Sequence, residues 1–254
     1  MDLSFLQSLT IALAIGIASG SIGTFVVSGR MALVGDALSH VALPGIALAI
    51  LYNVDPFWGV VVFLVGAALL VWWLEEKTGL PTEALIGLLF TVSLAVGILM
   101  IPDAELAESL FGGFTDLSLK TFLLLFMVSA ALSVLTFILA KRFLFINLSR
   151  ELANVEGIKD VHRLYLLLIF SLVVALGIKL VGSILMGALI IIPAIVARNI
   201  ARSSKGYLVF SVILGGIISL GGTFAAKYFG YLPGPTIIFL GALLFLVSLV
   251  LTKH

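Results

Sequence analysis

The segment that decides the fold of this chain reads GRMALVGDALSHVALPGIALA and covers residues 29 to 49. It places Asp36 and His40 four residues apart within an apolar run, and Pro44 interrupts the run shortly afterwards. An ionisable side chain inside a bilayer costs a few kcal/mol and usually marks a functional site. The segment therefore predicts a membrane helix with a chemical role.

The composition places the whole chain in a membrane. Of its 254 residues, 62% are hydrophobic and 11% are charged, whereas a soluble domain has about 25% charged residues. The apolar runs lack the alternation of barrel strands, so we predict an all-α polytopic membrane protein with a single domain over residues 1–254. The net charge of +1 gives no reason to expect nucleic acid as a partner, and the absence of cysteine excludes disulfides and thiolate ligands.

Nine apolar runs are long enough to be candidate membrane spans. They lie near residues 5–28, 36–52, 57–74, 82–101, 120–140, 164–181, 183–200, 207–226 and 235–251. Eight spans are possible, because the second run is short and only three residues separate the sixth run from the seventh. The first run lacks a cleavage site, so we expect it to be retained as a span. Its small residues Gly16, Gly20 and Gly23 predict close packing against another span.

The distribution of basic residues predicts the orientation. Eleven of the fourteen fall on one side of a nine-span arrangement: Arg30, Lys77, Lys141, Arg142, Arg150, Lys159, Arg163, Arg198, Arg202, Lys205 and Lys253. The other three are Lys120, Lys179 and Lys227. Basic residues concentrate on the cytoplasmic side of membrane proteins. We therefore expect the N-terminus outside and the C-terminus in the cytoplasm.

Asp36 and His40 have the spacing and the chemistry of a metal site. Residues four apart share one face of a helix, and carboxylate and imidazole suit zinc, manganese or iron. Two ligands form half a site, which a symmetric homodimer would complete. Pro44 breaks the helix nearby, and Pro193 is expected to kink the seventh span; broken helices are common in transport pathways.

Two plainer interpretations of these residues remain open. Asp36 follows Gly35 and could serve as the N-cap of the second helix. His40 could be a neutral histidine that is hydrogen-bonded to a neighbouring helix. A capping role would be compatible with a metal role.

Three segments resemble one known family. The match from Arg30 to Gly45 is similar, almost residue for residue, to the hallmark of the metal-uptake ABC permeases, the ABC-3 family. KLVGSILMGALIIIPAIVAR, residues 179–198, resembles a second family motif. Glu151, Ala153 and Gly157 match, more loosely, the family segment that docks on the ATPase. The inner loop departs from the usual acidic pattern by reading NLSRE.

The resemblance implies the membrane permease subunit of an ATP-driven importer of zinc, manganese or iron, with the fold of type II ABC importers. It implies a homodimer in the plasma (inner) membrane of a prokaryote, with an ATP-binding cassette subunit and an extracytoplasmic metal-binding protein as partners. Carried over, Asp36 and His40 line the ion pathway. The metal is the transported ion, and no permanently bound cofactor is expected.

The inner connection, at about 141–163, is the expected site of ATPase coupling. Its core SRELANVEG reads as one short helix in which Leu152 and Val155 form a small apolar face. Ser149 can cap this helix and Gly157 can end it. No stretch of the chain fits the P-loop pattern, so ATP hydrolysis would belong to a separate chain and this protein would not be an enzyme.

Two other functions remain as alternatives. The first is a proton-coupled secondary transporter, which would show inverted repeats with matching broken helices; we find no convincing pair. The second is a permease for a metal chelate such as a siderophore or a corrin, which would not need aspartate and histidine four residues apart.

Overall fold

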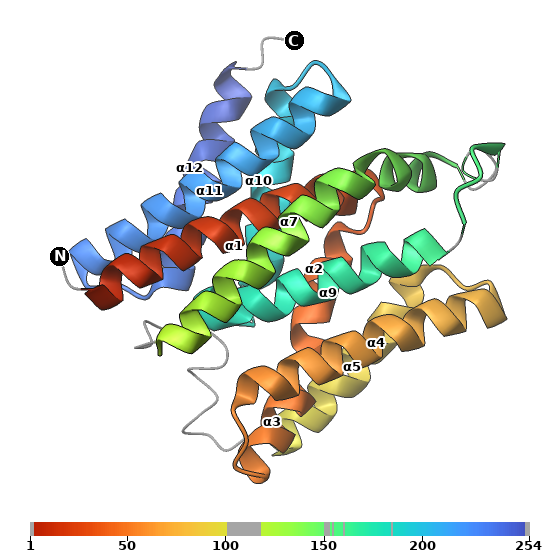
Figure 1. Ribbon diagram of the computed structural model, residues 1–254, viewed down its shortest axis with the longest axis horizontal. Coiled ribbons are helices and arrows are strands. Elements are labelled where there is room, and N and C mark those ends of the chain that lie inside the picture. The colour runs from red at the N-terminus through yellow and green to blue at the C-terminus, as the bar shows by residue number, and fades with distance from the viewer. Residues whose placement is uncertain are drawn as a thin grey trace.

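A computed structural model describes residues 3–100, 118–149, 153, 155–159, 161–183 and 185–251 of the chain. Its helices are α1 (Leu3–Ser28), α2 (Ala32–Val41), α3 (Leu43–Leu51), α4 (Pro56–Thr78), α5 (Thr82–Met100), α7 (Leu119–Leu148), α9 (Val161–Val181), α10 (Met186–Ile200), α11 (Ser204–Phe229) and α12 (Pro233–Leu251) (Figure 1). The described residues contain no strand. The predicted all-α class is confirmed.

The nine predicted spans all correspond to helices. In the described part of the chain, seven helical segments are long and apolar enough to cross a membrane, by length and composition. One of them, Ala32–Leu51, consists of α2 and α3, and the remaining two runs form the shorter apolar helices α5 and α10. The sixth and seventh runs form separate helices, α9 and α10. Most of the predicted acidic outer connection at 102–119 lies outside the described residues.

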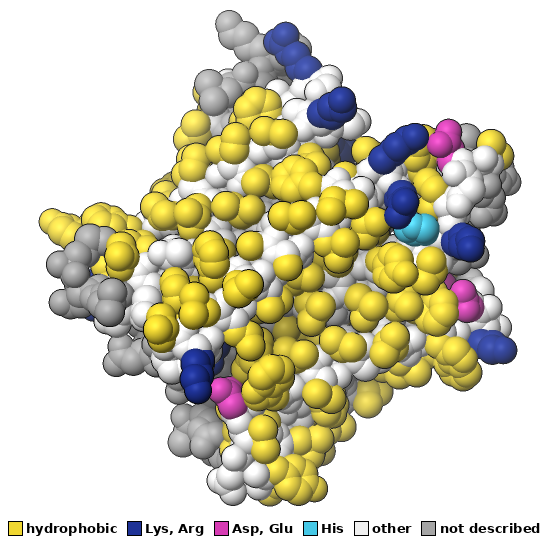
Figure 2. All heavy atoms as spheres, in the orientation of Figure 1, with side chains coloured by type: hydrophobic (Ala, Val, Ile, Leu, Met, Phe, Trp, Pro, Cys, Tyr) yellow, Lys and Arg dark blue, Asp and Glu magenta, His cyan; other side chains and the backbone are white. Residues whose placement is uncertain are grey.

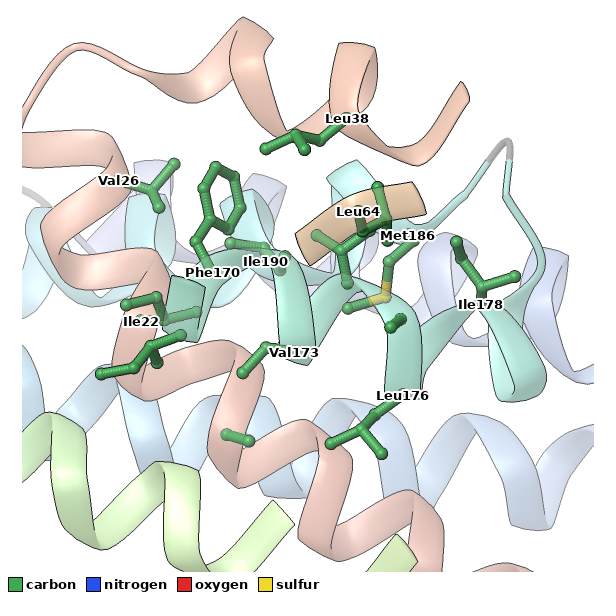
Figure 3. Packing of buried hydrophobic residues seen from close by; sticks show 14 of the residues in the cluster. Ile22, Val26, Leu38, Leu64, Phe170, Val173, Leu176, Ile178, Met186 and Ile190 are labelled. Carbon is green, nitrogen blue, oxygen red and sulfur yellow. The ribbon is translucent and has the colours of Figure 1, made fainter. Parts of the chain in front are cut away.

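Helix α9 lies at the centre of the bundle. Most of α1 and α9 is buried, whereas less than a third of α4 and of α12 is. Figure 3 shows Phe170 of α9 directed toward Leu38 of α2, with Val26 of α1 beside it. All three side chains are at most 2% exposed. Helix α2, which carries Asp36 and His40, is therefore packed against the buried centre of the molecule.

The small residues of α1 pack as the sequence predicts. A Cβ atom on Gly16 or Gly20 would overlap a carbonyl oxygen of α11, and one on Gly23 would overlap a carbonyl oxygen of α10. Ser211 of α11 donates a hydrogen bond of 2.6 Å to the Gly20 carbonyl. The close packing of the first span is confirmed, since no larger side chain fits at these contacts.

Side-chain contacts join several helix ends at one end of the bundle. Asn147 Nδ2 of α7 donates to the Phe25 carbonyl of α1 at 2.8 Å. Arg163 Nε of α9 donates to Glu75 Oε2 of α4 at 2.8 Å. We call this the basic end, because its helix ends carry Arg30, Lys77, Lys141, Arg142, Lys159, Arg163, Arg198, Arg202 and Lys205.

The opposite end of the bundle has fewer basic residues. The Lys179 ammonium lies 5.8 Å from the centroid of the Phe57 ring, and that of Lys227 lies 5.9 Å from the centroid of the Phe5 ring. Figure 2 shows the Lys and Arg side chains of the visible face mainly along its upper and right-hand edges, with hydrophobic side chains over the middle. This charge asymmetry matches the pattern predicted from the sequence.

Candidate metal-ion pathway

Asp36 lies inside a helix and does not cap one. Helix α2 begins at Ala32, its N-cap position is occupied by Met31, and no side chain caps it. The interpretation of Asp36 as the N-cap of the second helix is therefore wrong, because the helix starts four residues earlier. The Asp36 side chain is exposed on the surface of this single chain. The Asp36 carboxylate therefore does not cap the start of the helix and is available for another role.

His40 lies one turn further along α2 and is partly buried. Its ring meets that of Phe90 of α5 edge to face, with 5.4 Å between the ring centroids. The Nδ1 atom is buried and has no hydrogen-bond partner in the described part of the chain. A bond from this nitrogen to a neighbouring helix, the plainer interpretation of His40, is thus absent among these residues. Leaving a buried polar atom unpaired costs about 1–3 kcal/mol, a cost that a ligand can remove.

The two main sequence motifs pack against each other around Asp36. A Cβ atom on Gly187 of α10 would lie 2.8 Å from both the Cα and the nitrogen of Asp36. Gly35 of α2 faces the Phe170 ring of α9. A Cβ atom on Gly35 would lie 3.4 Å from the nearest carbon of that ring. Ser39 donates to the Gly35 carbonyl at 2.9 Å, so it bonds within its own helix. Gly187 holds the backbone of Asp36 by direct contact.

These neighbours were not predicted from the sequence. Gly187 lies inside the second motif, but residue spacing along the chain does not indicate which helix it contacts. Phe90 belongs to a span without a motif. The available signal was a glycine in an apolar run, which often marks a close backbone approach but does not say to what. Only the tertiary structure identifies both as neighbours of the site.

The helix break lies immediately after His40, as predicted from Pro44. Helix α2 ends at Val41, Ala42 separates the helices, and α3 begins at Leu43 with Pro44 in its first turn. Pro44 has no amide hydrogen to donate to the His40 carbonyl, and this carbonyl instead accepts from the Ala42 amide.

Close contacts fix the position of this break. Gly45 of α3 and Gly59 of α4 meet backbone to backbone, so that a Cβ atom on either would overlap the carbonyl oxygen of the other.

The second predicted break residue, Pro193, is buried inside α10, and the helix continues past it.

One chain supplies only part of a metal coordination set. The described residues contain no group of three or more His, Cys, Asp and Glu side chains that could hold a metal ion. Leu33, one turn before Asp36 on the same face of α2, is 85% exposed. The Asp36 face of α2 is therefore uncovered in the single chain.

The candidate coupling segment is shorter than the sequence suggested. Helix α7 continues to Leu148 and α9 begins at Val161, so the connection between these helices spans residues 149–160. Val155 is 86% exposed, whereas Ala153 is buried. Gly157 has a φ of 70°, the left-handed conformation expected of a glycine that ends a helix. Glu151 and Leu152 lie outside the described residues.

A protein-family model matches almost the whole chain. The family is described as ABC 3 transport family, and the match covers residues 2–252. A manganese import system permease protein of Streptococcus gordonii, ScaB, is 31% identical over 97% of this chain and 91% of its own length. A high-affinity zinc uptake system membrane protein of Haemophilus influenzae, ZnuB, is 30% identical over 95% of each chain.

Two solved structures resemble the fold. A chain of PsaBC from Streptococcus pneumoniae, solved in complex with a Fab, superposes with a TM-score of 0.84 and 30% sequence identity. This match covers 98% of the present chain and 91% of that chain. A chain from a structure described as an inward-facing conformation of a putative metal-chelate type ABC transporter superposes with a TM-score of 0.80 over 96% of this chain and 85% of that chain. Its sequence identity is 20%, so this second likeness bears on the fold alone.

Proposed function

The chain belongs to the ABC 3 transport family, and we propose that it is the membrane-spanning subunit of an ATP-driven importer of divalent transition-metal ions. Zinc, manganese or iron is the cargo, and Asp36 and His40 of two copies line the ion pathway. Like the permeases it resembles, this chain is a transport subunit and not an enzyme. The metal is substrate, and no resident cofactor is part of the proposal.

The observation that carries the proposal is the state of the two side chains on α2. Asp36 is exposed without a capping role, and His40 presents a buried Nδ1 without a partner in the described residues. Both lie on one face of a candidate membrane segment, where such groups are expensive unless they meet a ligand. A cation that needs one oxygen and one nitrogen ligand from each chain offsets that cost.

The cargo follows from ligand chemistry and from the relatives. Carboxylate and imidazole ligands accept zinc, manganese and iron. The relatives at 30–31% identity are named for manganese and for zinc, which favours these two metals. Iron remains within the proposal because the same ligands bind it.

A second copy of the chain completes the site. One chain contributes one carboxylate and one imidazole, so a two-fold axis beside α2 gives two of each. The exposed Leu33 and the exposed Asp36 occupy the face of α2 that such a copy would cover. In this arrangement the ion passes between the two copies.

The remaining partners follow from what this chain lacks. Since the sequence has no P-loop, a separate ATP-binding cassette subunit hydrolyses ATP. It contacts the segment from Glu151 to Gly157, on which Val155 is exposed. An extracytoplasmic metal-binding protein delivers the ion. With the basic end in the cytoplasm, the N-terminus lies outside and the C-terminus inside the plasma (inner) membrane of a prokaryote.

The two alternative functions have less support. A proton-coupled secondary transporter is not favoured by membership of an ABC transport family. A permease for a bulky chelate shares the fold, but its cargo brings its own ligands and does not require Asp36 and His40 on one helix face.

Metal uptake by matched variants tests the proposal. We expect Asp36→Asn and His40→Ala to lower the initial rate of manganese or zinc uptake by roughly tenfold or more, because even the loss of a residue that only orients a metal ligand costs about 10–100-fold. The measurement uses proteoliposomes that contain the permease, its ATPase and the binding protein. Glu76→Gln and His162→Ala, at the basic end, remove the same chemical groups and should leave the rate unchanged. Uptake at the native rate by both α2 variants would contradict the proposed pathway.

A further inference from the structure

A second site lies at the basic end, away from Asp36 and His40. A pocket of about 540 Å³ opens where the end of α1 meets the end of α10 and the start of α11. Three arginines line it: Arg30 follows α1, Arg198 lies in the last turn of α10, and Arg202 precedes α11. The pocket volume is within the range of about 300–1,000 Å³ that is typical of small-molecule sites.

The charge of this pocket is unbalanced. No carboxylate is among its lining residues. The only ion pairs between fully described residues are Lys141–Glu156 and Arg163–Glu75, neither of which involves a pocket arginine. Three guanidinium groups around one cavity repel one another, and an anion would relieve that repulsion. Guanidinium groups present planar sets of N–H donors that fit phosphate oxygens.

The backbone holds Arg30 at the pocket in an unusual conformation. Its φ is 60°, a left-handed value that residues with a Cβ seldom adopt. The turn is fixed by hydrogen bonds from the Arg30 amide to the Val27 carbonyl at 3.2 Å and from the Met31 amide to the Val26 carbonyl at 2.8 Å. Strain of this kind persists at sites where position matters. Here it holds a guanidinium beside the pocket.

Polar groups at the start of α11 also line the pocket. Tyr207 lines it, and the hydroxyl oxygen of this residue is buried without a hydrogen-bond partner within the described ranges. Ser203 and Ser204 also line the pocket, at the N-terminus of a 26-residue helix. Ser203 Oγ accepts from the Gly206 amide at 3.1 Å, and the positive end of the helix dipole favours an anion at this N-terminus. A phosphate oxygen in the pocket would meet donors from both α1 and α11.

The surroundings of the pocket indicate the kind of molecule that carries the phosphate. Ile200, Val209, Phe210 and Ile213, at the end of α10 and in the first half of α11, are between 42% and 50% exposed. The site therefore combines a cationic cavity with an apolar flank at the membrane boundary. Basic pockets of this kind, between membrane helices, suit anionic lipid head groups. We propose that this pocket binds the phosphate group of an anionic phospholipid.

The position of the site predicts its effect on transport. A head group bridging Arg30 to Arg198 and Arg202 joins the turn before α2 to the end of α10. These are the two helices that meet at Asp36 and Gly187. The bound lipid therefore stabilises the packing on which the metal pathway depends, without contacting the metal.

Lipid binding to the purified permease–ATPase complex tests this site. The delipidated complex is titrated with dioctanoyl phosphatidylglycerol, with dioctanoyl phosphatidylcholine and with inorganic phosphate, and thermal unfolding is followed. We expect phosphatidylglycerol to raise the unfolding temperature of the native complex. Replacing Arg198 and Arg202 together by Gln should raise the required lipid concentration by at least about tenfold, since the variant loses its charge-assisted hydrogen bonds to the phosphate.

A matched double variant separates this site from general charge effects. Lys205→Gln with Arg142→Gln removes the same charge from exposed positions at the same end, outside the pocket, and should bind like the native protein. Arg198 and Arg202 are exposed, so without lipid all three proteins should unfold at the same temperature. Equal loss in the control variant, or equal stabilisation by phosphatidylcholine, would overturn the proposal. Stabilisation by inorganic phosphate alone would assign the pocket to a soluble anion and overturn the lipid assignment.

Discussion

At the scale of single residues, Gly187 determines how closely α10 approaches α2, the helix that carries the proposed metal ligands Asp36 and His40. The Asp36 backbone rests against it, so there is no room for a side chain between the two helices. Packed interiors respond to one added carbon by shifting the backbone or by losing stability. The position of the Asp36 carboxylate therefore depends on the absence of a Cβ atom at residue 187.

Gly187→Ala tests this dependence. The added Cβ would lie 2.8 Å from Asp36 backbone atoms, and we expect a loss of about 1–3 kcal/mol in stability together with slower metal uptake. Gly66→Ala is the control, because nothing lies within 4 Å of its added Cβ, and alanine favours a helix by up to about 1 kcal/mol over glycine. If Gly187→Ala matched Gly66→Ala in both thermal unfolding and uptake, the close contact between Gly187 and Asp36 would affect neither stability nor transport.

The sequence predicted the shared helix face of Asp36 and His40, but it did not predict the residues that surround them. Asp36 and His40 share a helix face because their spacing matches one helical turn, which is a local property. The second span was predicted to start near residue 36, whereas α2 starts at Ala32. No capping side chain marks this start in the sequence. The contact of Gly187 with Asp36 joins two distant segments, and no periodicity encodes it.

At the scale of helices, the connection between α7 and α9 is the candidate lever for ATP-driven motion. Val155 on this segment is an 86% exposed hydrophobic residue at the basic end. An exposed apolar side chain on a short helix suits a groove in a partner protein. We expect Val155→Asp to leave membrane insertion intact and to lower ATP-driven uptake severalfold, because a charge does not fit such a groove.

The comparison of ATP hydrolysis with uptake in the assembled transporter measures this effect. Val54→Asp, at a 50% exposed position on the opposite end, is the matched control and should keep native coupling. Native uptake per ATP hydrolysed in Val155→Asp would place the coupling contact elsewhere on the chain.

An ion pair between Arg163 and the buried Glu75 lies at the start of α9, directly after the candidate coupling segment. Arg163 binds Glu75 at 2.8 Å, and the Glu75 side chain is only 5% exposed. Thr82 of α5 also donates to Glu75 at 2.8 Å. Removing one partner of a buried pair leaves an uncompensated charge and costs roughly 3–5 kcal/mol. We expect Glu75→Gln to lower the free energy of unfolding by about this amount, as measured in denaturing mixed micelles.

The exposed pair at the same end gives the contrast. Lys141 and Glu156 are 3.4 Å apart, with side chains 76% and 46% exposed, and such pairs contribute about 0–1 kcal/mol. Glu156→Gln should therefore unfold almost like the native protein. If Glu75→Gln and Glu156→Gln lowered the free energy of unfolding equally, burial would not strengthen the ion pair between Glu75 and Arg163.

The elements themselves were predictable because each apolar run has the length of a membrane helix. Their contacts were not, since Glu75 and Arg163 are 88 residues apart along the chain. The end of α7 also differed from the prediction. Lys141 and Arg142 suggested a loop, but both are exposed at the basic end and tolerate a helix that extends beyond the apolar run.

At the scale of the whole molecule, the central claim is that two chains share one metal site. A single chain has no cluster of three metal-binding side chains among its described residues, and the Asp36 face of α2 is uncovered. Pairing two such faces around a two-fold axis gives two carboxylates and two imidazoles for one ion. The predicted stoichiometry is one metal ion for two permease chains.

Pulsed electron paramagnetic resonance of manganese bound to the assembled transporter tests this claim most directly. At saturating manganese, we expect one bound ion per two permease chains. We also expect the electron spin echo of this ion to be modulated by a coordinated imidazole nitrogen. His40→Ala should abolish that modulation, and His162→Ala should leave it unchanged. An unchanged nitrogen signal in His40→Ala, or one bound ion for each chain, would contradict the shared site.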